Sequence, residues 1–228
     1  MAFVADQVEI EVGGEPLYGI LEIPEQCRGI VLFAHGSGSG RHSPRNHMVA
    51  EHLQSAQLGT FLFDLLTVAE ERIDQVTAQF RFDIEFLGAR LVAVTEWLVA
   101  SHPEAERLGY FGSSTGAAAA LIAAADSNHP IAAVVSRGGR PDLASRALPD
   151  VQSPTLLIVG DRDPQVLELN EQALAMLECE KQLVIVPGAT HLFEEPGTLQ
   201  LVAEHARRWL VEHLDKADAS LGEPSLCT

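Results

Sequence analysis

The sequence is poor in lysine, in cysteine and in long hydrophobic runs, and each shortage excludes a class of protein. Of its 228 residues, 32 are acidic and 15 are basic, and only two of the basic residues, Lys181 and Lys216, are lysines. A net charge of −17 repels phosphate groups, so the charge balance excludes a typical nucleic-acid-binding protein. An anionic membrane surface is repelled for the same reason. We therefore expect neither nucleic acid nor a membrane as a partner.

Apolar runs long enough to cross a membrane are missing as well. The longest run of small apolar residues, Ala117–Ala125, is far shorter than the roughly 20 residues that a membrane-spanning helix needs. The first ten residues, MAFVADQVEI, contain neither a basic segment nor a long apolar one, so we expect no secretory signal peptide.

The three cysteines are too few and too widely spaced to build a structural framework. Cys27, Cys179 and Cys227 form an odd number, and no metal-ligand spacing connects them. The sequence therefore predicts no disulfide framework, and it favours a reducing, cytoplasmic location.

The remaining composition is that of an ordinary globular protein, with 46% hydrophobic and 21% charged residues. The length favours one domain. We expect this domain to span residues 1–214, because residues 215–228 are polar, contain glycine and proline, and predict a flexible C-terminal tail.

Strand and helix signals alternate along the chain and predict an α/β fold. Val8–Val12 and Leu17–Ile23 flank two glycines and indicate a β-hairpin. Six further runs are typical of strands: Gly29–Ala34, Thr60–Asp64, Leu108–Phe111, Ile131–Ser136, Thr155–Val159 and Gln182–Val186. Helical patterns occupy Asn46–Gln57, Arg81–Ala100, Thr115–Ala125, Leu169–Leu177 and Leu199–Leu214. Only the acidic connector Leu65–Gln79 leaves its structure open. The sequence thus predicts a mostly parallel sheet of about eight strands with helices on both faces, and ligands bind such sheets beyond the carboxyl ends of the strands.

A candidate nucleophile stands at one of these strand ends. The segment Gly112–Gly116 (GSSTG) follows the strand that ends at Phe111 and precedes the alanine-rich helix. This is the G-x-S-x-G pattern in the strand–turn–helix context that a nucleophile elbow requires, because the glycines allow a tight turn that holds Ser114 exposed above the sheet. The alternative is a glycine- and serine-rich loop that only caps the helix.

A serine nucleophile needs a base, and the base needs a carboxylate that orients it. Asp161 and Asp163 lie in the loop GDRDP directly past one predicted strand, and His191 ends the loop PGATH past the last strand. Three adjacent strand ends would bring these side chains to Ser114. We predict that His191 is the base and that Asp163 orients it, with Asp161 as the alternative to Asp163.

The loop HGSGSG, which follows the buried strand ending at Ala34, has two interpretations. A dinucleotide-binding turn would need a third glycine at position 41, but Arg41 stands there. The other interpretation is an oxyanion loop, in which the backbone N–H groups of Ser37 and Thr115 face the reacting carbonyl. We expect the oxyanion loop.

Neither a metal nor a cofactor is expected. The neighbouring histidines His35, His42 and His47 are joined by no carboxylate or cysteine at a recognisable metal-ligand spacing.

Taken together, HGSGSG, GSSTG, GDRD and GATH resemble the motifs of the α/β-hydrolase fold, and the chain from Val8 to Leu214 looks like a member of its dienelactone-hydrolase-like group. Dienelactone hydrolases proper use a cysteine nucleophile, whereas Ser114 occupies that position here, so the resemblance implies a serine esterase. The short connection around Arg137–Val151, where many relatives insert a cap, implies an open site without a cap domain.

Arginines gather in the loops that should surround this site. Arg41, Arg137 and Arg140 are candidate ligands for a substrate carboxylate or phosphate, while the alternative is that they pair with local acids and hold the loops together.

The sequence therefore predicts a serine hydrolase that cleaves small-molecule carboxylic esters or lactones through an acyl-enzyme, without a cofactor. A thioesterase or small-peptide hydrolase would use the same three residues. A non-catalytic ligand-binding member of the fold is the alternative from another class, and the oligomeric state, monomer or homodimer, stays open.

Overall fold

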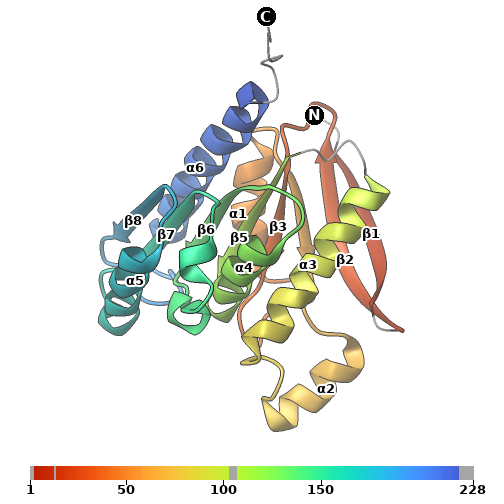
Figure 1. Ribbon diagram of the computed structural model, residues 1–228, viewed down its shortest axis with the longest axis horizontal. Helices are drawn as coiled ribbons and strands as arrows, with labels where there is room; N and C mark the ends of the chain where they lie inside the picture. Colours follow the sequence, from red (N-terminus) through yellow and green to blue (C-terminus); the bar gives the residue numbers. More distant parts are fainter. Residues whose placement is uncertain (1–2, 13, 103–106, 221–228) are drawn as a thin grey trace, which may run out of the picture.

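The computed structural model describes residues 3–12, 14–102 and 107–220. Its centre is one eight-stranded sheet in the order β1-β2-β4-β3-β5-β6-β7-β8 (Figure 1). The strands are β1 (Phe3–Val12), β2 (Glu15–Pro24), β3 (Ile30–Ala34), β4 (Gly59–Phe63), β5 (Leu108–Ser113), β6 (Ile131–Arg137), β7 (Thr155–Gly160) and β8 (Lys181–Val186). The pairs β1–β2 and β2–β4 are antiparallel, and the five pairs from β4 to β8 are parallel. The predicted α/β architecture with a mostly parallel sheet is confirmed.

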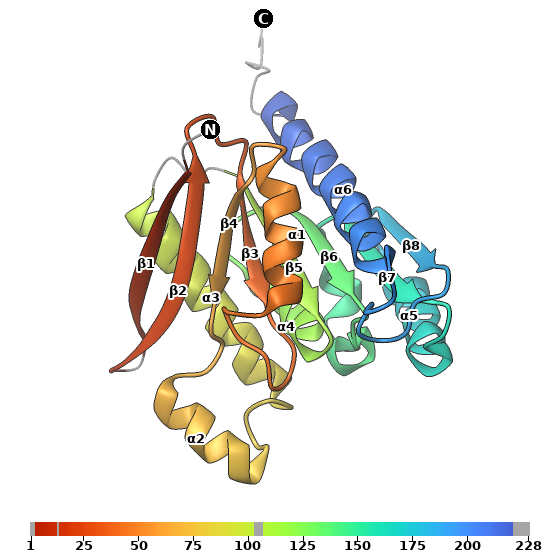
Figure 2. The same ribbon diagram turned by 180° about the vertical axis from the view of Figure 1, so that it is seen from behind.

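Helices cover both faces of the sheet. They are α1 (Pro44–Gln54), α2 (Val68–Thr77), α3 (Ile84–Ser101), α4 (Thr115–Asp126), α5 (Pro164–Met176) and α6 (Thr198–Ser220). Helices α1 and α6 pack on one face, and α3, α4 and α5 on the other (Figures 1 and 2). Helix α2 covers neither face and projects beyond the carboxyl ends of the parallel strands.

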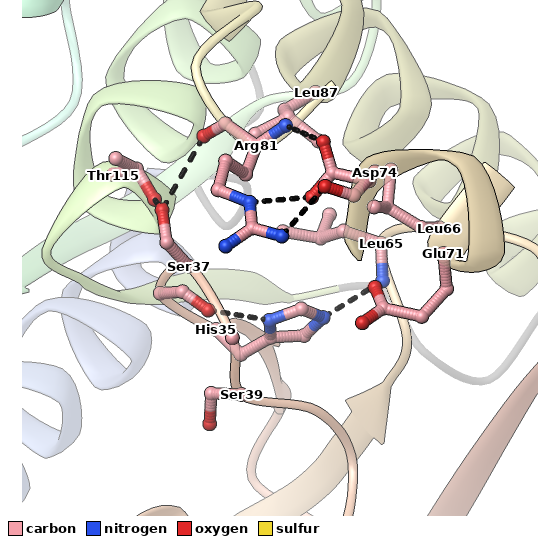
Figure 3. A pocket seen from close by; sticks show the side chains of 12 residues that line it. His35, Ser37, Ser39, Leu65, Leu66, Glu71, Asp74, Arg81, Leu87 and Thr115 are labelled. Atoms are coloured by element: carbon pink, nitrogen blue, oxygen red, sulfur yellow. Dashed lines mark hydrogen bonds and ion pairs between the residues drawn. The ribbon is translucent and has the colours of Figure 1, made fainter. Parts of the chain in front are cut away.

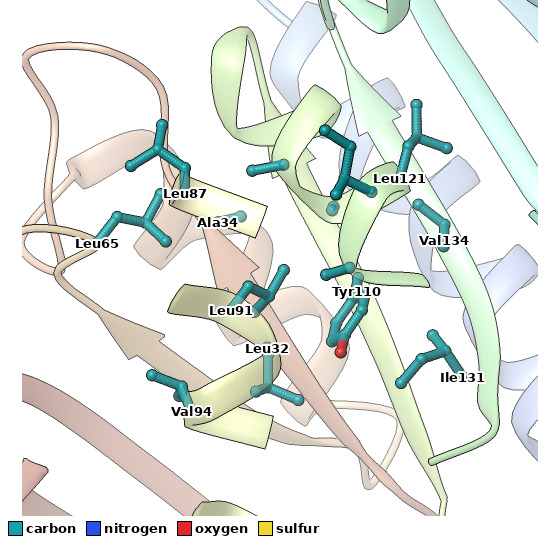
Figure 4. Close-up of a cluster of buried hydrophobic side chains, with 14 of the residues drawn as sticks. Leu32, Ala34, Leu65, Leu87, Leu91, Val94, Tyr110, Leu121, Ile131 and Val134 are labelled. Atoms are coloured by element: carbon teal, nitrogen blue, oxygen red, sulfur yellow. The ribbon is translucent and has the colours of Figure 1, made fainter. Parts of the chain in front are cut away.

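Two apolar clusters fill the space between the sheet and its helices. In the larger one, Leu32 and Tyr110 from the sheet pack against Leu91 of α3 (Figure 4). The Tyr110 hydroxyl is fully buried and shares a 2.8 Å hydrogen bond with Thr95 Oγ1. Burial raises the pKa of Tyr110 to about 12, so this hydroxyl stays neutral. Both faces of the central strands are therefore packed, as their apolar runs predict.

Several segments differ from the prediction. Strand β1 and helix α5 each begin five residues before the predicted start, at Phe3 and Pro164. Helix α2 forms in the connector whose structure the sequence left open, and a reciprocal capping box between Thr67 and Glu70 begins it. Helix α6 continues to Ser220 rather than ending at Leu214. The remainder of the predicted tail, residues 221–228, lies outside the described residues.

The connection between β6 and β7 holds only two short 3-10 helices, Pro141–Ala144 and Leu148–Asp150. No cap domain is inserted there, as predicted. In the part of the chain that the structure describes, no helix has the length and apolar character needed to cross a membrane.

Candidate active site

Ser114 occupies a strained turn between β5 and α4. Its backbone has φ of 51° and ψ of −121°, a left-handed φ that residues other than glycine rarely adopt. The flanking glycines make this turn possible: a Cβ atom on Gly116 would lie 2.2 Å from the Ala34 carbonyl oxygen, and one on Gly112 would lie 2.4 Å from Ala117 Cα. Two positions of the GSSTG motif therefore exclude any side chain, as a nucleophile elbow requires.

His191 and Asp163 form a hydrogen-bonded pair at the carboxyl ends of β7 and β8. His191 Nδ1 lies 2.6 Å from Asp163 Oδ2, and the carboxylate is largely buried. Since an ionised carboxylate can only accept, the neutral imidazole donates from Nδ1, which leaves Nε2 as a proton acceptor. Asp161 does not contact the histidine, because its Oδ1 accepts the Gly188 N–H at 2.7 Å within the turn. Of the two aspartates, the structure thus brings Asp163 to His191.

The serine and the histidine line the same cavity, which has a volume of about 200 Å³. Its lining includes Ser114, His191 and Ser37. His191, Ser114 and the predicted oxyanion loop therefore border one space, and Asp163 contacts His191 from outside the lining. Ser37, Ser114, Asp163 and His191 follow β3, β5, β7 and β8, so these four predicted residues all lie beyond the carboxyl ends of parallel strands.

One detail of the prediction is wrong: the three strand ends are not adjacent. Strand β6 lies between β5 and β7, and its exit loop fills the space between the elbow and the histidine loop. The Ser114 N–H donates to the Arg137 carbonyl oxygen at 3.3 Å. Gly138, with φ of 50°, allows the close approach of His191, whose carbonyl oxygen would lie 3.1 Å from a Cβ there. Because position 138 carries no side chain, the His191 loop packs closely against the end of β6, which Ser114 also contacts.

The predicted oxyanion loop is held by His35, whose structural role the sequence analysis missed. The buried ring accepts the Leu65 N–H at Nε2, at 2.9 Å, and its Nδ1 lies 2.9 Å from the Gly36 carbonyl oxygen (Figure 3). Burial lowers the pKa of His35, which keeps the ring neutral. A neutral ring that accepts at Nε2 donates at Nδ1, so one histidine ties the loop to the end of β4.

The two predicted oxyanion residues, Ser37 and Thr115, lie side by side. Their hydroxyl oxygens are 3.1 Å apart and share a hydrogen bond that connects the loop after β3 to the start of α4 (Figure 3). The Ser37 hydroxyl also lies 3.5 Å from the Arg81 carbonyl oxygen, in the segment between α2 and α3. Side-chain contacts therefore fix the spacing of the backbone groups expected to bind an oxyanion.

A second network fixes α2 beside this loop. The Asp74 carboxylate, which is 2% exposed, accepts the Phe80 N–H at 2.7 Å. It also accepts the backbone N–H of Arg81 at 3.0 Å and the Arg81 Nε at 2.6 Å (Figure 3). Burial alone would raise the pKa of Asp74, but these hydrogen bonds outweigh it and hold the pKa below its ordinary value. No sequence motif marks this contact; the capping signature Thr67–Glu70 could have revealed the helix that brings it about.

The structure separates the three arginines proposed as substrate ligands. Arg41 forms an ion pair with Asp64, and Arg140 binds Asp142 through two hydrogen bonds of 2.8 Å, so both make the local pairs of the alternative interpretation. Arg137 makes no ion pair with any described residue and lines the cavity beside Ser114. Burial lowers the pKa of Arg137 to about 10, and the nearby positive charge of Arg45 adds to this shift.

Among the described residues, no group of three or more histidine, cysteine or carboxylate side chains is arranged to hold a metal ion.

Comparisons with known proteins show the family and the fold of this chain. A family model described as an alpha/beta hydrolase domain matches residues 27–207. The crystal structure of a dienelactone hydrolase from Anabaena variabilis is similar, with 54% sequence identity, a TM-score of 0.89, and coverage of 92% of this chain and 98% of that one. Est1E from Butyrivibrio proteoclasticus shares the fold at 16% identity, with a TM-score of 0.77 over 92% of this chain and 99% of its own.

The curated relatives carry the name of a transferase rather than that of a hydrolase. A Mycobacterium tuberculosis protein named a phosphoribosyl transferase is 56% identical over 211 residues, which are 92% of this chain and 46% of the relative. The chain thus spans about half the length of the curated relatives it matches.

Proposed function

The chain belongs to the α/β-hydrolase domain family and has a dienelactone-hydrolase-like structure, and from this membership we propose that it is a serine hydrolase that cleaves carboxylic esters or lactones. The observation that carries the proposal is the 2.6 Å contact between His191 and Asp163 at a cavity that Ser114 also lines. A strained serine, an oriented imidazole and a buried carboxylate are the three parts of a catalytic triad.

The proposed mechanism follows from these positions. His191 Nε2 takes the hydroxyl proton of Ser114 while the serine oxygen attacks the substrate carbonyl carbon. The backbone N–H groups of Ser37 and Thr115 stabilise the oxyanion, and each such donor is typically worth about 3–4 kcal/mol of the barrier. The imidazolium returns the proton to the departing alcohol, which leaves an acyl-enzyme. A water molecule, deprotonated by His191, then releases the acid. Asp163 keeps the proton of His191 on Nδ1 and stabilises the imidazolium throughout.

The transferase name of the mycobacterial relative describes a protein about twice as long as the shared segment. The family model for an alpha/beta hydrolase domain covers most of that segment in this chain. We therefore assign hydrolase chemistry, rather than phosphoribosyl transfer, to the segment that this chain shares with the mycobacterial relative.

A fluorophosphonate probe, which labels activated serines covalently, tests the proposal. Labelling is expected for the wild type and absent for Ser114→Ala. Ser113→Ala is a matched control in the same motif: Ser113 is buried, with its hydroxyl directed at Asn46, so this variant should still be labelled. Labelling of Ser114→Ala would refute the assignment of the nucleophile.

Turnover separates the remaining alternatives. We expect hydrolysis of short p-nitrophenyl esters by the wild type. Faster turnover of matched thioesters or amides would favour the thioesterase or peptidase alternative. A wild type that is neither labelled nor active on any of the three would favour a non-catalytic, ligand-binding protein.

A further inference from the structure

One edge of the sheet, the outer edge of β8, has no partner strand. In the part of the chain that the structure describes, β8 is the last strand in the sheet order, and both views place it at the outer margin (Figures 1 and 2). Three of its six residues, Lys181, Gln182 and Ile185, are exposed. Such an edge offers a row of backbone N–H and C=O groups to another strand.

Hydrogen bonds to β7 show which backbone groups of β8 remain available. N–H groups at the start of β7 and just past its end donate to the carbonyl oxygens of Glu180 and Val186, at 2.8 and 3.2 Å. Backbone groups alternate between the two sides of a strand, so those of the even-numbered residues face β7. The N–H and C=O groups of Lys181, Leu183 and Ile185 therefore point away from the sheet.

The side chains of β8 do little to prevent pairing with another strand. Edge strands in natural proteins are usually protected by proline, by bulges or by several charges. Strand β8 has the sequence KQLVIV, in which Lys181 is the only charged residue, and its pairing with β7 is regular. Ile185 is 45% exposed, although Leu183 on the same face of the strand packs against the larger apolar cluster. A single chain thus leaves a large apolar side chain uncovered beside an open row of hydrogen-bonding groups.

The opposite edge of the sheet has a different character. Strand β1 carries the exposed carboxylates Asp6, Glu9 and Glu11 and no basic residue. Two copies that met through β1 would bring these carboxylates together, and like charges on neighbouring strands are destabilising. Of the two sheet edges, only that of β8 therefore suits a second copy of a chain whose net charge is −17.

The outward backbone groups also define how a second copy fits. Antiparallel strands pair through residues whose backbone groups face each other. A single antiparallel register joins all three outward residues: Leu183 lies opposite its own equivalent, and Lys181 lies opposite Ile185 of the second copy. The alkyl stem of Lys181 then covers the exposed Ile185 side chain. Glu180, just before the strand, falls opposite Val186, so no like charges are paired. The edge is thus complementary to itself.

We propose that the chain forms a two-fold symmetric homodimer in which the β8 edges of two copies pair antiparallel, with Leu183 at the two-fold axis. This contact is closed, because each copy uses its β8 edge once and the carboxylates of β1 protect the outer edges of the joined sheet. The loop that carries His191 directly follows β8, so the dimer also holds the strand from which this loop begins. The inference concerns association alone and does not depend on the proposed hydrolase function.

Association is measured on the purified 228-residue chain by sedimentation equilibrium and by light scattering after size exclusion. We expect a monomer–dimer equilibrium in which the dimer predominates by about 100 μM, since a paired edge strand forms a small interface of modest affinity. Because association stabilises the folded state, Tm should rise with protein concentration. A wild type that stays monomeric at this concentration would overturn the proposal.

Charge substitutions test the register. Ile185→Lys places an ammonium group opposite Lys181 of the second copy, twice per dimer, and should raise the dimer Kd by on the order of ten- to a hundredfold. Adding Lys181→Glu to this variant turns both contacts into opposite-charge pairs and should restore much of the affinity; a double variant as weak as Ile185→Lys alone would refute the register.

Leu201→Lys is the matched control for the added charge. Leu201 is also 45% exposed but lies on α6, so this variant should keep the wild-type Kd. An Ile185→Lys variant that dimerises as the wild type does, or a Leu201→Lys variant that loses the dimer, would show that the copies do not meet through β8.

The backbone groups give an independent readout. Ile185→Pro removes an N–H that faces outward, so it leaves the hydrogen bonds to β7 in place and should weaken the dimer without unfolding the chain, which circular dichroism checks. In the wild type, the N–H groups of Leu183 and Ile185 should exchange with deuterium more slowly as the protein concentration rises. Exchange at these two positions that does not depend on concentration, in a wild type that dimerises, would refute the pairing of β8.

Discussion

The two aspartates of the loop GDRDP offer the sharpest test of the site, because they lie two positions apart and only Asp163 contacts His191. Asp163→Asn replaces a carboxylate that accepts from Nδ1 at 2.6 Å with an amide that can present N–H to the same nitrogen. The amide would then favour the tautomer with the proton on Nε2, which cannot accept the serine proton.

The size of the effect follows from the geometry. At this contact the charge centres of carboxylate and imidazolium are about 4 Å apart, and their attraction is about 4 kcal/mol at an effective dielectric constant of about 20. Loss of the hydrogen bond that fixes the tautomer adds about 1 kcal/mol. A total near 5 kcal/mol corresponds to a decrease in kcat/KM of roughly several thousandfold, since each 1.36 kcal/mol is a factor of ten.

Asp161→Asn is the matched control. The amide oxygen of asparagine can still accept the Gly188 N–H, so we expect less than a threefold change in kcat/KM. The assay is hydrolysis of p-nitrophenyl acetate near pH 8, with thermal unfolding to confirm that both variants fold. An Asp163→Asn variant that keeps more than a tenth of the wild-type activity, or an Asp161→Asn variant that loses as much, would refute the assigned triad.

Three further predictions concern stability. Gly116→Ala should prevent formation of the elbow and lower Tm together with fluorophosphonate labelling, because its Cβ would lie 2.2 Å from the Ala34 carbonyl oxygen; an unchanged Tm would contradict this contact. Asp74→Asn should reduce the free energy of unfolding by about 2 kcal/mol near neutral pH. Since the folded pKa of Asp74 lies below its unfolded value near 3.9, this stabilisation is present above about pH 4 and is lost as the pH falls through the folded pKa. The difference in Tm between wild type and variant should therefore shrink between pH 6 and pH 3, and a constant difference would refute the assignment. Tyr110→Phe should cost about 1 kcal/mol in urea unfolding through loss of the 2.8 Å bond to Thr95, and an unaltered unfolding midpoint would count against that bond.

Much of the fold could be predicted from the sequence because it depends on periodicity and on local turns. Buried parallel strands need continuous apolar runs, and the elbow needs glycines at two fixed positions, so both can be read without knowledge of the rest of the chain. Helix α2 was left open because its residues bury little apolar surface. What holds it is the contact of Asp74 with Arg81 and the pairing of Glu70 with Arg90 of α3, neither of which produces an apolar pattern.

The candidate site could be predicted only to the level of loops. Asp161 and Asp163 have equal chemistry and nearly equal positions, and the choice between them depends on which carboxylate the turn directs at His191. The arginines pose the same problem. Whether Arg41 pairs with Asp64, and Arg140 with Asp142, depends on how the loops fold. The position of the β6 exit loop could also be learned only from the structure, because the strand order places β6 between the strands that Ser114 and Asp163 follow.

The position of β8 at the edge of the sheet has a consequence for biosynthesis. Ser114 follows a central strand, whereas His191 follows β8, the last strand in the sequence and an edge strand of the sheet. At translation rates of about 5–20 residues per second, the ribosome makes the histidine about 4 to 15 s after the serine. During that interval the nascent chain contains Ser114 but not His191, so the proposed nucleophile is present without its proposed base. If the proposed triad is correct, a chain truncated before β8 should lack esterase activity because it lacks His191.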